Sequence, residues 1–73
     1  MYIMIKVGEI YRHYKGNIYI VIGIGTHTET NDKMVVYSPI NDRNIVWIRP
    51  YSMWSETIDK NKEIKRFELV NNG

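Results

Sequence analysis

Trp47 and Arg49 are the two residues whose types and spacing favour ligand binding most directly. They lie two positions apart in a segment with strand composition, and side chains two apart in a strand project from the same face. An indole ring stacks on a planar base, and a guanidinium offers a fork of donors to a phosphate or a carboxylate. Arg12, His13 and Lys15 add positive charge from the end of an earlier strand and its turn. These five residues predict a surface that binds an anionic nucleotide-type ligand, either a small nucleotide or single-stranded nucleic acid.

The same residues allow a purely structural interpretation. Trp47 would then cap a small barrel, and Arg49 would pair with the carboxylate of Glu56. The chain also has six tyrosines, and tyrosine is common at protein interfaces because it combines an apolar ring with a polar hydroxyl. A protein–protein interaction adaptor, or a homo-oligomeric structural module, is therefore the alternative function.

Catalysis is the third hypothesis. His27 lies two positions from Glu29, so that the carboxylate could orient the imidazole as a base, and His13 is the other candidate for a hydrolase or transferase. The sequence has no nucleophile elbow, P-loop or metalloprotease helix motif. A metal site needs three or four convergent ligands, and the two histidines come from separate segments. We therefore expect a non-enzymatic protein without metal or cofactor, in which Tyr11, His27, Glu29 and Glu56 are accessory to the binding surface.

Five short segments that must position these residues have the composition of β-strands and are separated by polar turns. They are residues 9–14, 18–25, 34–37, 45–49 and 64–70. No window has a sustained helical period, and residues 51–55 are expected to form at most one short helical turn. The sequence predicts an all-β fold, a small closed or nearly closed five-stranded barrel, because closure protects strand edges.

The second of these segments has the strongest strand signal. Isoleucine occupies every second position, at Ile18, Ile20, Ile22 and Ile24. A period of two places the isoleucines on one face, and we expect that face to be buried. Gly23 and Gly25 on the other face predict a bend, a bulge or a close neighbour.

Composition limits the class of protein. The chain has 73 residues, of which 44% are hydrophobic and 25% charged, so we expect one small globular domain. It has no cysteine, which excludes disulfides and is consistent with a reducing cytoplasm. We find neither a signal-peptide pattern nor an apolar stretch of about 20 residues, so we expect a cytoplasmic protein that does not contact a membrane. A net charge of +2 is too small for the basic stripe of a duplex-DNA binder.

The domain itself is expected to span residues 8–70. Residues 1–7 form an N-terminal extension whose apolar side chains alternate, so they could supply an extra strand across a subunit boundary. Residues 71–73 are expected to be a frayed C-terminus. Oligomerisation is a way for a small domain without disulfides to gain stability, so a homo-oligomer is expected.

Two motifs resemble a known family. The run YRHYKG at residues 11–16 and the pattern Trp-x-Arg-Pro at residues 47–50 are similar to the small bacterial and phage family called domain of unknown function 1653. The similarity covers roughly residues 8–68, and Trp54 stands where the family usually has Phe. The resemblance implies an SH3-like β-barrel, in agreement with the five expected strands, and it implies no activity.

Overall fold

The structure is a computed structural model that describes residues 4–54 and 56–71. Its elements, in chain order, are β1 (Ile10–His13), β2 (Ile18–Thr26), β3 (Lys33–Pro39), β4 (Trp47–Pro50), the 3-10 helix η1 (Tyr51–Met53), β5 (Thr57–Asp59), β6 (Ile64–Lys65) and β7 (Phe67–Asn71). The prediction of an all-β fold with one short helical turn is confirmed for these residues.

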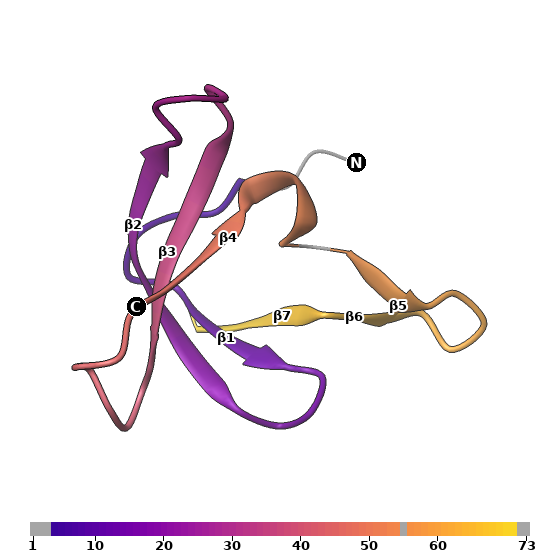
Figure 1. Cartoon of the computed structure of the whole chain (residues 1–73). Coiled ribbons are helices and arrows are strands. Elements are labelled where there is room, and N and C mark those ends of the chain that lie inside the picture. The colour runs from indigo at the N-terminus through magenta and orange to yellow at the C-terminus, as the bar shows by residue number, and fades with distance from the viewer. Residues whose placement is uncertain (1–3, 55, 72–73) are drawn as a thin grey trace.

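Five antiparallel strands form one curled sheet with the order β4-β3-β2-β1-β7, so that the last strand lies beside the first. The curvature gives a half-barrel, and the small β5–β6 hairpin projects from one side of it (Figure 1). The last predicted strand, residues 64–70, is divided at Arg66 into β6 and β7. Gly16 forms the β1–β2 turn with a φ of 105°, a conformation that glycine adopts without strain.

The core lies on the concave side of the sheet, which we call the inner face. Its buried hydrophobic side chains are Ile5, Tyr11, Val21, Val35, Tyr37, Trp54 and Phe67. Trp54 stacks on Phe67 with ring centroids 3.9 Å apart, and Tyr11 and Tyr37 meet Trp54 edge to face. Large aromatic rings therefore fill a core that this short chain supplies with little aliphatic volume.

The expectation that the alternating isoleucines are buried together is wrong. Val21, which is 1% exposed, points to the inner face, whereas Ile18 and Ile20 are only partly buried on the convex side and Ile22 is exposed. The register of the β1–β2 pair explains this result. Tyr19 lies opposite Tyr11, whose side chain is buried on the inner face, so Tyr19 and Val21 point inward and Ile18 and Ile20 point outward.

The expected bulge is confirmed in β2. The pairing with β3 shifts between Val21 and Gly23, so that Ile22 is the extra residue. The shift reverses the alternation, and Ile24 consequently packs against the core.

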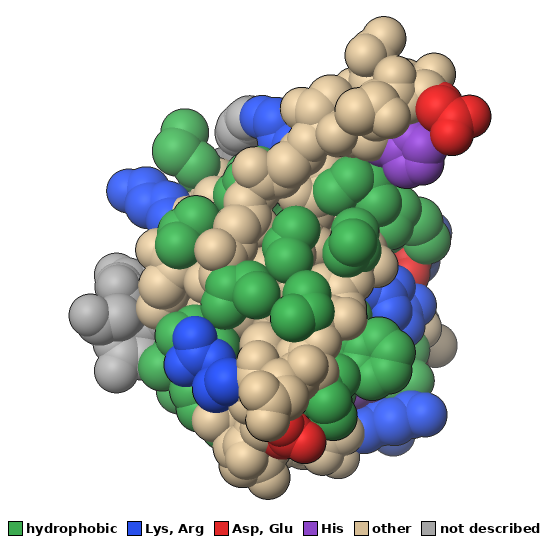
Figure 2. Space-filling view, turned by 60° about the vertical axis from the view of Figure 1, so that its left-hand side comes forward, with side chains coloured by type: hydrophobic (Ala, Val, Ile, Leu, Met, Phe, Trp, Pro, Cys, Tyr) green, Lys and Arg blue, Asp and Glu red, His purple; other side chains and the backbone are tan. Residues whose placement is uncertain are grey.

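The convex side, which we call the outer face, is apolar. Its side chains include Ile18, Ile20, Ile22, Val36 and Ile48, as the registers of β2, β3 and β4 show. Figure 2 shows hydrophobic side chains gathered in the middle of this face. Ile48 is 62% exposed there.

The N-terminal segment contributes to the core. Ile5 is buried, and its backbone N–H donates a 2.8 Å hydrogen bond to the Tyr51 hydroxyl. Residues 4–7 do not form a strand, and residues 1–3 of the expected extension lie outside the described residues. At the other end Asn71 still pairs with Ile10, while residues 72–73 of the expected frayed end also lie outside the described part. Over the residues that the structure describes, we find no helix with the length and apolarity needed to cross a membrane.

Candidate functional site

Trp47 and Arg49 share the inner face of β4, as their spacing predicts. Trp47 pairs with Tyr37 and Arg49 with Val35 across the β3–β4 ladder. The indole is 51% exposed, whereas Arg49 is half-buried with its guanidinium 5.7 Å from the centroid of the Phe67 ring. Arg49 therefore lies against the aromatic core while Trp47 presents a ring to solvent.

Arg49 has no carboxylate partner among the residues that the structure describes. Its buried Nε receives no hydrogen-bond acceptor from the described part of the chain. The carboxylate of Glu56 instead forms an ion pair with Arg66 and accepts a 2.7 Å hydrogen bond from it. The structure thus contradicts the interpretation in which Arg49 pairs with Glu56.

His13 lies at the end of β1, directly across from Phe67 on β7. Its ring packs against Tyr14, Phe67 and Tyr19, with centroids 4.5, 5.1 and 6.4 Å away. Nδ1 accepts a 3.2 Å hydrogen bond from the backbone N–H of Lys15. Neutral imidazole must then carry its proton on Nε2, which leaves that atom as a donor.

Three cations act on this imidazole electrostatically. The pKa of His13 lies below its usual range, because the ring is partly withdrawn from water and because Arg66, Lys15 and Arg49 repel an added proton. We call His13, Lys15, Arg49 and Arg66 the His13 cluster. Only Arg66 among its cations has a carboxylate partner in the described residues, so the cluster carries uncompensated positive charge.

A hollow of about 610 Å³ adjoins this cluster, and we call it the Trp47 hollow. It is lined by residues 16–19 and 39–42, by Ile45 and by Trp47. Tyr19 connects the two features, because its ring lines the hollow and also meets His13 edge to face. The volume of the Trp47 hollow falls within the range of about 300–1,000 Å³ that is typical of small-molecule sites.

Ser38 holds the loop that forms one wall of this hollow. The side chain is fully buried, and its Oγ donates a 2.6 Å hydrogen bond to the carbonyl of Ile45. The bond spans the loop from the end of β3 to the residues just before Trp47. Ser38 therefore positions the loop, and nothing in the sequence pattern singles it out.

The remaining predicted residues are placed elsewhere. Arg12 pairs with Ile18 on the outer face, away from the His13 cluster, and Tyr11 is buried in the core. His27 and Glu29 are exposed in the β2–β3 loop, where the Glu29 backbone N–H donates to Nδ1 of His27. No group of three or more His, Asp or Glu side chains that could hold a metal occurs among the described residues.

Arg66 and Phe67 are the site residues that sequence reasoning missed. Arg66 stands among alternating charges, which usually indicate a solvated surface. The aromatic residue that follows Arg66 was the available signal, because it marks the return of the chain to the core next to β1. A strand-pairing register was needed to place both beside His13.

Comparison with known proteins agrees with the fold. The sequence profile of a family described as "Protein of unknown function (DUF1653)" matches residues 9–69. The structure is similar to the crystal structure of a protein of this family from Bordetella bronchiseptica, with a TM-score of 0.75 and 32% sequence identity, and the match covers 94% of this chain and 91% of that chain. No curated protein matches the chain. The profile match spans all the strands except the last two residues of β7, and it shows that the chain belongs to the DUF1653 family.

Proposed function

We propose that this protein is a non-enzymatic module that binds an anionic nucleotide-type ligand, a small nucleotide or a segment of single-stranded nucleic acid. One observation carries the proposal: Arg49, Arg66 and Lys15 all act on the partly buried imidazole of His13, and only Arg66 has a carboxylate partner in the described part of the chain. An anion placed there would relieve the mutual repulsion of the cations and would accept hydrogen bonds from them. A cytoplasmic location, which the lack of cysteine favours, belongs to the same proposal.

The Trp47 hollow supports a planar group beside that anion. The exposed indole offers a stacking surface, and such stacking contributes about 1–3 kcal/mol per base. Arg49 lies two residues along the same face, within reach of a phosphate attached to the stacked group. In this arrangement Trp47 and Tyr19 contact the base, while Arg49, Lys15 and the Nε2–H of His13 contact the phosphate.

Arg12, which the sequence grouped with these residues, is left out of the proposed site. It occupies the next position before His13 on β1, and neighbouring side chains on a strand point to opposite faces. Arg66 replaces it as a source of positive charge.

Isothermal titration calorimetry tests the proposal with inorganic phosphate, adenosine monophosphate and a short oligothymidine. We expect the nucleotide to bind more tightly than phosphate, and we expect all affinities to fall as salt rises. Lys15→Gln should weaken binding severalfold, whereas Lys33→Gln, a matched change beside Tyr51, should not. Equal loss in both variants, or no binding of any of the three probes, would contradict the site.

The outer face favours a second candidate, a homo-oligomer. Contiguous apolar surface on a sheet commonly marks an interaction site, and Ile48 lies at its edge strand. Analytical ultracentrifugation should show that Ile48→Lys lowers the mass of a self-associated protein to that of a monomer. Ile58→Lys is the control, because Ile58 is 38% exposed in β5, which is not part of the five-stranded sheet. A wild-type protein that stays monomeric at high concentration would end this candidate.

A further inference from the structure

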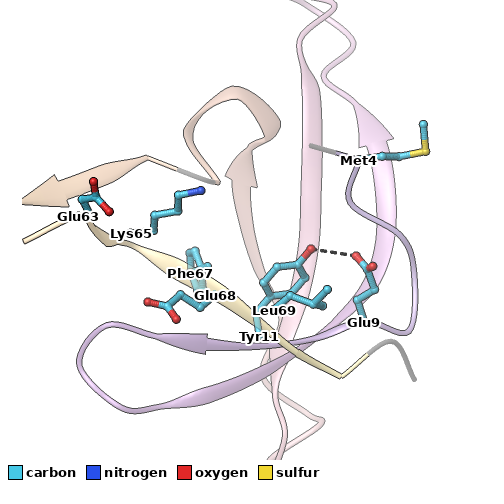
Figure 3. Close-up of a pocket in the computed structure, with 8 residues that line it drawn as sticks. All are labelled: Met4, Glu9, Tyr11, Glu63, Lys65, Phe67, Glu68 and Leu69. Atoms are coloured by element: carbon cyan, nitrogen blue, oxygen red, sulfur yellow. Dashed lines mark hydrogen bonds between the residues drawn. The ribbon is translucent and has the colours of Figure 1, made fainter. Parts of the chain in front are cut away.

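A second hollow, of about 470 Å³, lies beside the edge strand β7 and the N-terminal segment. Its apolar and aromatic walls are Met4, Tyr11, Phe67 and Leu69 (Figure 3). We call it the Glu9 hollow, after the buried carboxyl group that lines it. Phe67, which contacts His13 and Arg49, also lines this hollow, but none of the cations of the His13 cluster does.

Glu9 is the feature that points to a ligand. The residue is only 7% exposed, yet it sits in the wall of the hollow and extends toward Tyr11 (Figure 3). One oxygen, Oε1, accepts two hydrogen bonds, from the Lys6 backbone N–H at 2.8 Å and from the Tyr11 hydroxyl at 2.9 Å. The other oxygen, Oε2, receives none from any residue that the structure describes. Oε2 is not sealed from solvent, so this unused acceptor is open to a donor that enters the hollow.

Tyr11, like Glu9, presents to the hollow an oxygen atom that can accept a hydrogen bond. Burial, and then the hydrogen bond to Glu9, raise the pKa of the Tyr11 hydroxyl above its usual range, so the phenol keeps its proton at neutral pH. That proton is directed at Glu9, and the buried indole N–H of Trp54 also acts on the phenol oxygen, which leaves the rest of its acceptor capacity to the hollow. The two buried polar side chains of the wall thus offer acceptors only, and they fit a ligand that donates.

The charges around the opening of the hollow are mainly negative, which favours a donor that carries positive charge. Glu63 and Glu68 contribute carboxylates, and Lys65 is the one basic residue among the described residues of the lining. The rings of Tyr11 and Phe67 add aromatic surface, which attracts a cation electrostatically.

We propose that the Glu9 hollow binds a primary alkylammonium group, with Glu9 Oε2 and the Tyr11 oxygen accepting two of its three N–H donors. The alkyl chain then lies along Met4 and Leu69 toward the opening. The group is supplied either by a small free amine or by the lysine side chain of a peptide. This site is independent of the anion site of the proposed function, since the two require opposite charges.

Isothermal titration calorimetry of the full chain at low salt tests the assignment with three probes. n-Butylammonium represents the free amine, Nα-acetyl-lysine methylamide represents the peptide, and tetramethylammonium is a cation without donors. We expect the first two to bind and tetramethylammonium to bind at least tenfold more weakly. Whichever of the two primary amines binds more tightly shows whether the natural ligand is a small free amine or the lysine side chain of a peptide. No heat with either primary amine, or equal affinity for tetramethylammonium, would overturn the proposal.

Variants then locate the binding. Glu9→Gln removes the charge but keeps an acceptor for Tyr11 and Lys6, and it should weaken n-butylammonium binding at least tenfold. Lys65→Gln removes the competing cation and should strengthen binding severalfold; this exposed variant keeps the test valid even if Glu9→Gln fails to fold. Glu29→Gln and Lys33→Gln are the matched controls outside the lining. Weakening by Glu29→Gln as large as by Glu9→Gln, or weakening by Lys65→Gln, would refute the location.

Discussion

Replacing Arg49 by Gln separates the binding role of this residue from a structural one. Two opposing contributions to the free energy of unfolding can be worked out from its contacts. The guanidinium loses its cation–π contact with Phe67, 5.7 Å away, which is worth about 0.5–2 kcal/mol. The buried Nε without an acceptor disappears as well, and an unsatisfied buried group costs about 1–3 kcal/mol. Because the two nearly cancel, we expect the stability of Arg49→Gln to lie within about 1 kcal/mol of wild type.

Ligand affinity should respond much more strongly. A hydrogen bond to a charged group contributes about 1.5–3 kcal/mol, so losing the contact of Arg49 with a phosphate should weaken nucleotide binding by roughly tenfold to 150-fold. The assay pairs thermal denaturation with calorimetric titration of adenosine monophosphate. For a domain of this size 1 kcal/mol corresponds to a change in Tm of about 4–8 °C, which is readily measured.

Arg12→Gln is the matched control, since it removes the same charge from the other face of the sheet. We expect this variant to bind adenosine monophosphate like the wild type. A loss of more than about 3 kcal/mol of stability in Arg49→Gln, with unchanged affinity, would refute the binding role of Arg49. Binding weakened as much by Arg12→Gln as by Arg49→Gln would refute it as well.

Three further predictions concern stability. Val21→Ala should cost about 2–3 kcal/mol because Val21 is buried in the core, and Ile20→Ala should cost clearly less despite removing more atoms; chemical denaturation of both variants checks the order. His13 has a lowered pKa in the folded state, so the unfolded chain binds the proton first. The stability contributed by neutral His13 is therefore present above its usual pKa of 6.5 and is lost as the pH falls through the lower folded value. His13→Gln should flatten the fall in urea midpoint over this window, and an unchanged slope would contradict the assignment. Ser38→Ala leaves the Ile45 carbonyl without its 2.6 Å donor and should cost about 1–3 kcal/mol, with faster hydrogen exchange confined to residues 40–46; uniform exchange across the sheet would argue against a local role.

Strand content follows from local pattern, which explains why the fold class could be predicted. Alternating apolar residues, Gly16 in the first turn and Pro50 at the end of β4 act within a few residues of themselves. The same local rules gave the shared face of Trp47 and Arg49 and the single helical turn at η1. These features depend only on backbone sterics and on a side-chain period of two.

Which face is buried, and which distant residues meet, depended on the tertiary structure. A period of two defines two faces of β2 but does not say which one the sheet curls around, and the pairing of Tyr19 with Tyr11 settled it in favour of Val21. The closing of β7 against β1 brought Arg66 and Phe67 to His13, although more than fifty positions separate them in the chain. Sequence therefore determined the five strands of the curled sheet and their two-sided pattern, whereas β5 was not predicted. Register and curvature, which arise from contacts between distant strands, decided the core and the candidate site.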